Sequence, residues 1–249
     1  NIILHEEAIN TEKTPTMPVD VAGAMSQGQI GYWLQNALRN QLEQLKIKKP
    51  IASIITQVLV SKDDPAFKNP SKPIGPFYTE EEAKRIAKAR GVTVKEDAGR
   101  GWRKVVPSPM PLSIIESDLI KIAIGNGAIV VASGGGGIPV YYDEHGRLTG
   151  LEAVIDKDFA AEKLAETIDA DMLLILTAVD TVKINYKQPN EQAIDQITVG
   201  DAFKLIAQGQ FAAGSMLPKV EAGINFVAGG GKRICIITTP NLWIVVHHS

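Results

Sequence analysis

The stretch AIVVASGGGGIPVYY, residues 128–142, holds two short apolar runs separated by four consecutive glycines. The β-branched and aromatic residues of 128–132 and 138–142 predict two strands. Glycine accepts positive φ angles and lets a backbone come close to a ligand, so the loop between the strands is suited to presenting N–H groups to an anion. A plain tight turn is the alternative. The glycines are Gly134, Gly135, Gly136 and Gly137.

Strand and helix patterns alternate on both sides of this stretch. Apolar residues spaced by three and four predict a helix over 24–45, and the β-branched run 51–60 predicts a buried strand. Such alternation is typical of an α/β fold with a mainly parallel sheet covered on both faces. Further elements are predicted downstream as helices at 113–125, 158–168, 198–208 and 215–227, and strands at 172–176, 234–238 and 242–246.

Residues 61–109 interrupt the alternation with many prolines and charges. Long irregular excursions of this kind are usually functional or disordered, so the segment is predicted to be a protruding lid subdomain. Within it, Thr79 and Glu82 have the spacing of a capping box. The basic run 100–104 adjoins Glu96 and Asp97, which favours an internal salt-bridged turn over a nucleic-acid surface.

Composition narrows the class of protein. The chain has 249 residues, a net charge of −2 and a single cysteine, Cys235, which lies in an apolar run that predicts a buried strand. We expect one domain spanning residues 1–249, and no nucleic-acid or membrane partner. No apolar run approaches the ~20 residues of a membrane span, which fits a cytoplasmic enzyme. The four histidines lack metal-ligand spacing, so no protein-built metal site is predicted.

The run AVIDKDFAAEK, residues 153–163, places two lysines and two aspartates where an apolar run meets a helical pattern. Cations, a carboxylate that holds them and a nearby glycine loop suit phosphoryl transfer, which needs positioning and charge neutralisation. Lys157, Asp158 and Lys163 are therefore candidate catalytic residues. The alternative is that Asp158 only caps the helix beside a solvated lysine.

Two further lysines lie next to backbone-restricting residues. Lys219 follows a turn marked by glycine and proline near the start of a predicted helix, which makes a ligand contact credible. Lys72 lies among prolines at the predicted tip of the lid, where a stiff backbone lowers the entropy of holding it over a site. Taken alone, Lys72 is better explained as a solvated lysine, and a surface lysine is also the alternative for Lys219.

Taken together, these segments resemble the carbamate kinases of the amino-acid kinase superfamily. The match runs in order from residue 1 to about 238 and is more specific than any single motif. The matching segments are 12–20, 23–28, 30–34, 69–77, 95–103, 105–109, the glycine loop, 156–163, 184–186 and 214–219.

The resemblance implies a three-layer αβα sandwich around a mainly parallel sheet, and a homodimer. It implies reversible phosphoryl transfer between carbamoyl phosphate with ADP and carbamate with ATP, with Mg²⁺ held mainly by the nucleotide phosphates. In fermenting organisms this is the ATP-yielding step of arginine breakdown. Lys157 and Lys219 would neutralise the phosphoryl group, with Asp158 holding them, while Lys163 and Lys72 would contact carbamoyl phosphate. The residues expected to flank the nucleotide are Thr177, Val179, Tyr186, Met216 and Leu217.

The ends of the chain depart from the family pattern. The family's first strand and two upstream loops, Gly-Gly-Asn-Ala and His-Gly-Asn-Gly-Pro-Gln-Val-Gly, are absent, and residues 239–249 do not look like the family's C-terminus. If the sequence is complete, a weakly active or inactive protein is expected. The alternatives are a nucleotide-binding remnant without turnover, or another superfamily member with a larger acid substrate.

Overall fold

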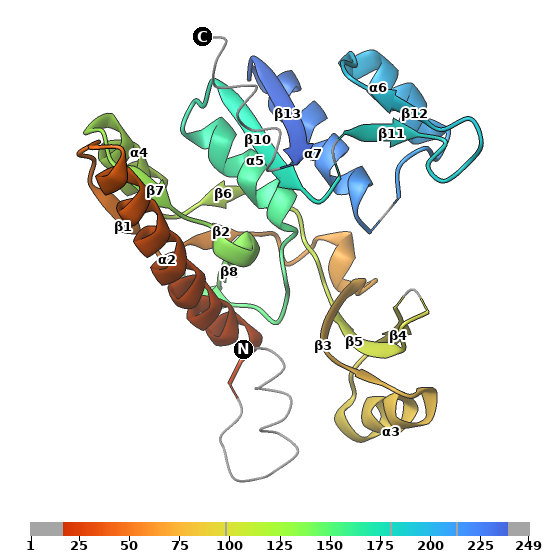
Figure 1. Ribbon diagram of the computed structural model, residues 1–249. Coiled ribbons are helices and arrows are strands. Elements are labelled where there is room, and N and C mark those ends of the chain that lie inside the picture. Colours follow the sequence, from red (N-terminus) through yellow and green to blue (C-terminus); the bar gives the residue numbers. More distant parts are fainter. Residues whose placement is uncertain (1–16, 98, 180, 213, 239–249) are drawn as a thin grey trace. The chain divides into compact units, whose positions relative to one another are not determined.

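The computed structural model describes residues 17–97, 99–179, 181–212 and 214–238 (Figure 1). The chain divides into two compact units, residues 1–160 and 161–249, which are described separately. The strand predicted at 242–246 lies outside the described residues. None of the described helices is both long and apolar enough to cross a membrane. The single domain with a lid over about 61–109 remains a prediction.

A long helix and a pair of parallel strands form one part of the first unit. α2 (Val19–Gln44) contacts β1 (Ile51–Ser53) and β7 (Ile129–Val131), which pair in parallel. α4 (Ser117–Gly125) packs against β7. The predicted helix over 24–45 is confirmed, and the structure begins it five residues earlier, directly after Pro18.

A four-stranded sheet carries the glycine loop of the first unit. β2 (Gln57–Leu59) pairs in parallel with β8 (Ile138–Tyr142), so two of the strands predicted from the sequence are neighbours. β6 (Ser113–Ile114) and β9 (Leu148–Gly150) extend the sheet with antiparallel pairings, in the order β6-β2-β8-β9. The predicted α/β class with parallel strands is confirmed.

The predictions for 51–60 and 113–125 were wrong in detail. Instead of one strand, 51–60 forms β1 and β2, because the backbone of Thr56 bonds to the side chain of Gln27 between them. β1 then pairs with β7 and β2 with β8. The helix predicted from 113 begins at Ser117, because Ser113 and Ile114 pair with β2 as a strand.

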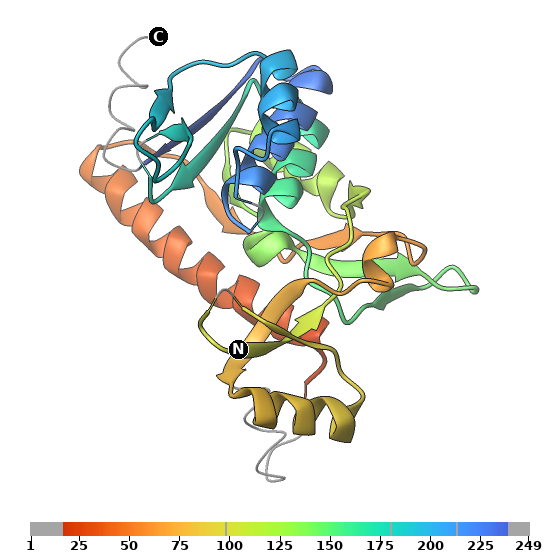
Figure 2. The same cartoon turned by 90° about the vertical axis from the view of Figure 1, so that its right-hand side faces the viewer.

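The predicted lid segment forms a small antiparallel sheet with one helix. β3 (Lys72–Tyr78) and β4 (Val94–Glu96) both pair with β5 (Trp102–Val106), preceded by the 3₁₀ turn η1 (Pro65–Phe67). α3 (Glu80–Arg90) lies beside this sheet in both views (Figures 1 and 2). The predicted capping box is confirmed, since Thr79 and Glu82 each bond to the other's backbone N–H.

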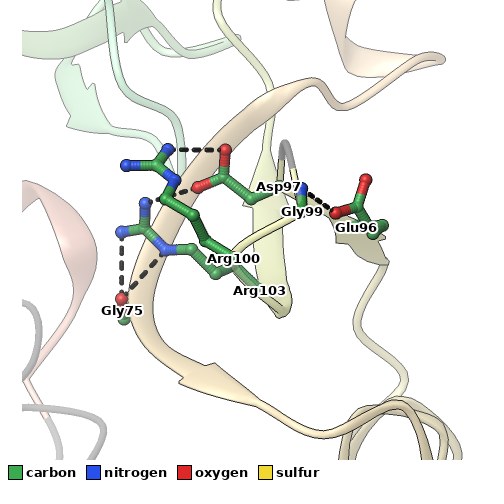
Figure 3. A network of polar contacts seen from close by, with 6 residues as sticks. All are labelled: Gly75, Glu96, Asp97, Gly99, Arg100 and Arg103. Carbon is green, nitrogen blue, oxygen red and sulfur yellow. Dashed lines mark hydrogen bonds and ion pairs between the residues drawn. The ribbon is translucent and has the colours of Figure 1, made fainter.

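The salt-bridged turn predicted at 100–104 is also confirmed (Figure 3). Asp97 accepts from Arg100 at 2.8 Å and from Arg103 at 3.1 Å, and these bonds hold the pKa of its carboxyl below the usual value. Arg103 also donates twice to the carbonyl of Gly75, at 3.1 and 2.9 Å, and lies over the ring of Phe77. The basic run therefore braces the bulge in β3, where the register with β5 shifts.

The second unit is built on the parallel pair β10 (Met172–Thr177) and β13 (Arg233–Thr238). Phe226 of α7 (Met216–Ala228) packs with Leu173 and Ile175 of β10 and Ala165 of α5 (Lys157–Thr167). A second cluster joins α7 to α6 (Val199–Ala207). A short hairpin not predicted from the sequence completes the unit, formed by β11 (Val182–Ile184) and β12 (Gln192–Ile194). Cys235, in β13, is half-buried.

Candidate functional site

The glycine loop contains the tight turn η2 (Gly134–Gly136), and at Gly136 and Gly137 glycine is required by space as well as by conformation. Gly136 has φ +105°, and a Cβ there would lie 2.3 Å from the carbonyl oxygen of Ile155. Gly137 has φ +82°, and its Cβ would lie 2.3 Å from Val58. The loop is therefore pressed against the segment that leads into α5 and against β2.

A buried polar network fixes Ser133, the residue that precedes the glycine loop. The side-chain amide of Gln27 exchanges two hydrogen bonds with the backbone of Thr56, at 2.9 and 3.0 Å. The Thr56 hydroxyl accepts from the amide of Ser133 at 2.9 Å and donates to the carbonyl of Ile54 at 2.8 Å. Nothing in the sequence signalled this network, because its members lie in three distant segments. The buried hydroxyl of Ser133 has no partner among the described residues.

Replacing Thr56 with valine tests this network, because valine keeps the shape and removes both hydroxyl bonds. We expect the free energy of unfolding to fall by about 1–3 kcal/mol, since the buried amide of Ser133 loses its acceptor. Urea titration measures the loss. The control is Thr149→Val, which removes only a long hydroxyl bond of 3.5 Å in the β8–β9 hairpin. Equal stability of the two variants would contradict the role assigned to Thr56.

Helix α5 begins one residue earlier than predicted, and Asp156 rather than Asp158 caps it. Asp156 Oδ1 accepts from the amide of Asp158 at 2.9 Å, as a capping side chain does. The carboxylate of Asp158 is buried in the first turn, 4.0 Å from the ammonium of Lys157, which is exposed. The alternative stated for Asp158, that it caps the helix, is therefore wrong, because Asp158 lies inside the first turn and its amide is the group that is capped.

Lys72 lies next to this helix start. It is the first residue of β3 and pairs with Val106, so it belongs to the base of the predicted lid and not, as predicted, to its tip. Its ammonium donates to Asp156 Oδ2 at 2.7 Å. Burial raises the pKa of Asp156, but the Lys72 bond, the Asp158 amide and the charges of Lys72 and Lys157 outweigh burial and leave it below its usual value. The first unit thus brings together the glycine loop, Lys72, Lys157 and Asp158.

The remaining charged candidates lie in the second unit. Lys219 is buried in the first turns of α7, with 9% of its surface exposed. Lys163 forms an ion pair with Glu166, one turn along α5. Glu162, buried on α5, is a group that was not assigned a role from the sequence. Burial raises the pKa of the Glu162 carboxyl. The positive charge of Lys163 opposes this shift, and the negative charge of Glu166 adds to it.

The raised pKa of Glu162 predicts a pH-dependent cost in stability. Because the folded-state pKa lies above the unfolded one, the ionised form destabilises the fold at neutral pH, and the cost vanishes as pH falls below the unfolded value. We therefore expect Glu162→Gln to unfold at higher urea concentration than the wild type at pH 7, with the gap closing toward pH 4. Glu144→Gln, an exposed control, should show no such gap. A gap that grows as pH falls would contradict the assignment.

The residues predicted to flank the nucleotide lie at the ends of three elements, β10, β11 and α7. Thr177 is the last residue of β10, and Val179 lies two residues further along the chain. Met216 and Leu217 begin α7 and pack against the cluster that joins it to α6, while Tyr186 is exposed after β11. A carboxyl end of a parallel strand and a helix N-terminus are common positions for a bound nucleotide.

The second unit also contains a pocket of about 710 Å³, lined by mostly apolar residues of 181–236. None of the five predicted nucleotide residues contributes to its lining. The pocket instead continues the buried cluster of Phe211, Val220 and Ile224 between α6, α7 and β13. Among the described residues, no group of three or more histidine, cysteine, aspartate or glutamate side chains is placed to hold a metal ion.

Comparison with known proteins places these observations in a family. The model of the amino acid kinase family matches residues 16–238. Carbamate kinase 2 of Enterococcus faecalis is 54% identical over 239 residues, which are 96% of this chain and 76% of that protein. The carbamate kinase of Thermococcus kodakarensis is 54% identical over 222 residues, 89% of this chain and 70% of that protein.

Solved structures agree with the sequence comparison. A carbamate kinase from Giardia lamblia bound to AMP-PNP superposes with a TM-score of 0.88 at 43% identity, covering 98% of this chain and 77% of that one. The likeness therefore extends over both units of the chain and through the segments that carry the candidate residues. The chain belongs to the amino acid kinase family and, within it, to the carbamate kinases.

Proposed function

We propose that this chain catalyses reversible transfer of the phosphoryl group of carbamoyl phosphate to ADP. A terminal oxygen of ADP forms the new bond to phosphorus, the bond between phosphorus and the carbamoyl oxygen breaks, and carbamate leaves. The observation that supports this most directly is the cluster of Lys72, Lys157, Asp158 and the glycine loop in one unit. Cations and backbone amides around a small space stabilise the charge that spreads over the transferring group.

In this proposal the four lysines contact different parts of the substrates. Lys157, exposed beside the buried Asp158, and Lys219, at the start of α7, neutralise the transferring phosphoryl group. Lys72 and Lys163 contact carbamoyl phosphate. The amides of Gly136 and Gly137 donate within the turn to Ser133 and Gly134, so we propose the amides of Gly134 and Gly135 as the donors to substrate.

The nucleotide is proposed to bind at the ends of β10 and α7 in the second unit. Val179 and Leu217 would pack against its adenosine part. Mg²⁺ is proposed to be held mainly by the nucleotide phosphates, which is how this hard cation commonly binds in kinases. The described residues supply no cluster of ligands that would take over this task.

The direct test is ATP formation from ADP and carbamoyl phosphate with Mg²⁺, after intact mass confirms a protein of 26.8 kDa. ATP is the product to follow, because carbamoyl phosphate releases inorganic phosphate on its own. We expect saturable turnover that requires both substrates. A folded protein that binds ADP but forms no ATP would overturn the proposal and favour a nucleotide-binding remnant. Turnover only with larger acyl phosphates would favour another superfamily activity.

We also propose that two copies of the chain associate. Tyr32, Trp33 and Leu34, three consecutive residues of α2, are 64%, 58% and 46% exposed, so this stretch of helix presents large apolar side chains on its surface. Light scattering coupled to size-exclusion chromatography would show a mass twice that of one chain. Trp33→Glu should shift that mass toward one chain, because a charge in the centre of an apolar interface is costly to bury. An unchanged mass would contradict this location.

A further inference from the structure

Residues 152–156, here called the strap, connect β9 to α5 and run along the base of the lid sheet. At one end Glu152 pairs with Lys104 of β5 at 2.5 Å. In the middle, the amide of Val154 donates to the carbonyl of Pro107 at 3.0 Å, and its side chain packs against a cluster of Val19, Ile74 and Val106. At the other end Asp156 pairs with Lys72 of β3. The strap is thus tied to two of the three strands of the lid sheet, β3 and β5, before it enters the helix.

Asp156 differs from the other strap residues because its carboxylate bonds in two directions. Oδ2 accepts from the ammonium of Lys72 at 2.7 Å, and Oδ1 accepts from the amide of Asp158 at 2.9 Å. The side chain is only 14% exposed, and that of Lys72 is 33% exposed, so water competes weakly for the pair. One carboxylate therefore joins the lid lysine to the first turn of α5, whose Lys157 and Asp158 are in the proposed site.

The glycine loop also packs against the strap, next to Asp156. The missing side chain at Gly136 lets the loop approach the strap so closely that a Cβ would lie 2.3 Å from the oxygen of Ile155 and 3.5 Å from the nitrogen of Lys157. Asp156 thus bonds to Lys72 and to the helix start, while the glycine loop lies against its two chain neighbours, Ile155 and Lys157. The three groups that are proposed to bind phosphate therefore meet at residues 155–158 of the chain.

We propose that Asp156 is a positioning residue that fixes the ammonium of Lys72 beside the first turn of α5 for the phosphorylated substrate. The proposal rests on the proposed phosphoryl transfer. A lysine side chain has many rotamers, and ordering it before the substrate arrives removes that entropic cost from binding. An ammonium has three donors, so a bond to Asp156 occupies one and leaves two for phosphate oxygens. Asp156 acts through Lys72 and does not itself contact the reacting atoms.

The test compares Asp156→Asn with Glu152→Gln, both neutral and of unchanged shape. Asparagine keeps an oxygen for the amide of Asp158, so the helix cap survives while the charge that holds Lys72 is lost. We expect the KM for carbamoyl phosphate to rise about 10- to 100-fold, as for loss of a charge-assisted bond, with the KM for ADP changed less than about twofold. Glu152→Gln, which loses only the peripheral pair with Lys104, should match the wild type.

A double-mutant cycle with Lys72→Met separates positioning from a merely structural role. If Asp156 acts through Lys72, adding Asp156→Asn to Lys72→Met should cause no further rise in KM. Fully additive losses, or an unchanged KM in Asp156→Asn alone, would overturn the proposal. If Asp156→Asn alone folds poorly, comparing Lys72→Met with the double variant still tests the proposal, because a further rise in KM in the double variant would count against positioning.

Hydrogen exchange distinguishes failure of this proposal from failure of the proposed activity. The amides of Lys72 and Ile74 should exchange faster in Asp156→Asn than in the wild type, because the ion pair that holds the start of β3 is lost, and Glu152→Gln should leave them unchanged. If the wild type forms no ATP and this difference is present, the phosphoryl-transfer proposal fails while the link between Lys72 and α5 stands. Equal exchange in all three proteins would overturn the link itself.

Discussion

Replacing Lys219 with methionine is expected to lower kcat/KM for ATP formation about 100- to 1,000-fold, the range typical of removing one preorganised charge-stabilising group. Lys219 lies near the N-terminus of α7 and is only 9% exposed, so its charge acts where water screens it little. Methionine has a similar volume and flexibility, which keeps the packing of the helix. The loss should appear mainly in kcat, because the charge on the transferring group is greatest in the transition state.

The matched control is Lys204→Met on α6, where the lysine is 74% exposed and pairs with Asp201. That variant removes the same charge from the same unit, and kcat/KM should stay within about twofold of the wild type because surface pairs contribute little. Thermal unfolding of both variants would show whether the Lys219 effect reflects folding. Equal kcat/KM in the two variants would contradict the role proposed for Lys219 in phosphoryl transfer.

Sequence patterns predicted those elements whose cause is local. The bounds of β8 follow from a β-branched and aromatic run, and the start of α3 follows from Thr79 and Glu82 three residues apart. The salt-bridged turn around Asp97 was likewise predictable, because its partners are three and six residues away. Where the deciding contact joins residues that are at most six positions apart, composition and spacing are enough.

The errors arise where a distant residue decides the local structure. The break between β1 and β2 is set by Gln27, which bonds to Thr56 across 29 residues. The helix predicted from Ser113 starts later because β2, far earlier in the chain, pairs with Ser113 and Ile114. The pairing of Lys72 with Asp156 spans 84 residues, and no periodicity or motif encodes it. The sequence therefore named most of the candidate side chains and missed the partners that orient them.

Gly136→Ala is expected to be the most destabilising single-methyl change in the glycine loop. The substitution adds one methyl group at φ +105°, a conformation that alanine rarely adopts, and places it 2.3 Å from the carbonyl oxygen of Ile155. We expect the free energy of unfolding to fall by about 3–5 kcal/mol, from backbone strain and overpacking together. The obstructing atom belongs to the backbone, so no side-chain rotation relieves the contact. Urea titration followed by circular dichroism measures the loss.

Gly146→Ala separates the two contributions, because Gly146 has φ +72° and no atom within 4 Å of an added Cβ. Its loss should be about 1–2 kcal/mol, the cost of the left-handed conformation alone. The difference between the two variants then measures how tightly the glycine loop is pressed against the strap. Gly136→Ala should also raise the KM for carbamoyl phosphate, since relieving the clash moves the strap that holds Asp156 and Lys157. If both changes lowered the free energy of unfolding equally, the close approach of Gly136 to Ile155 would contribute nothing to stability. That result would contradict the tight packing of the glycine loop against the strap and α5.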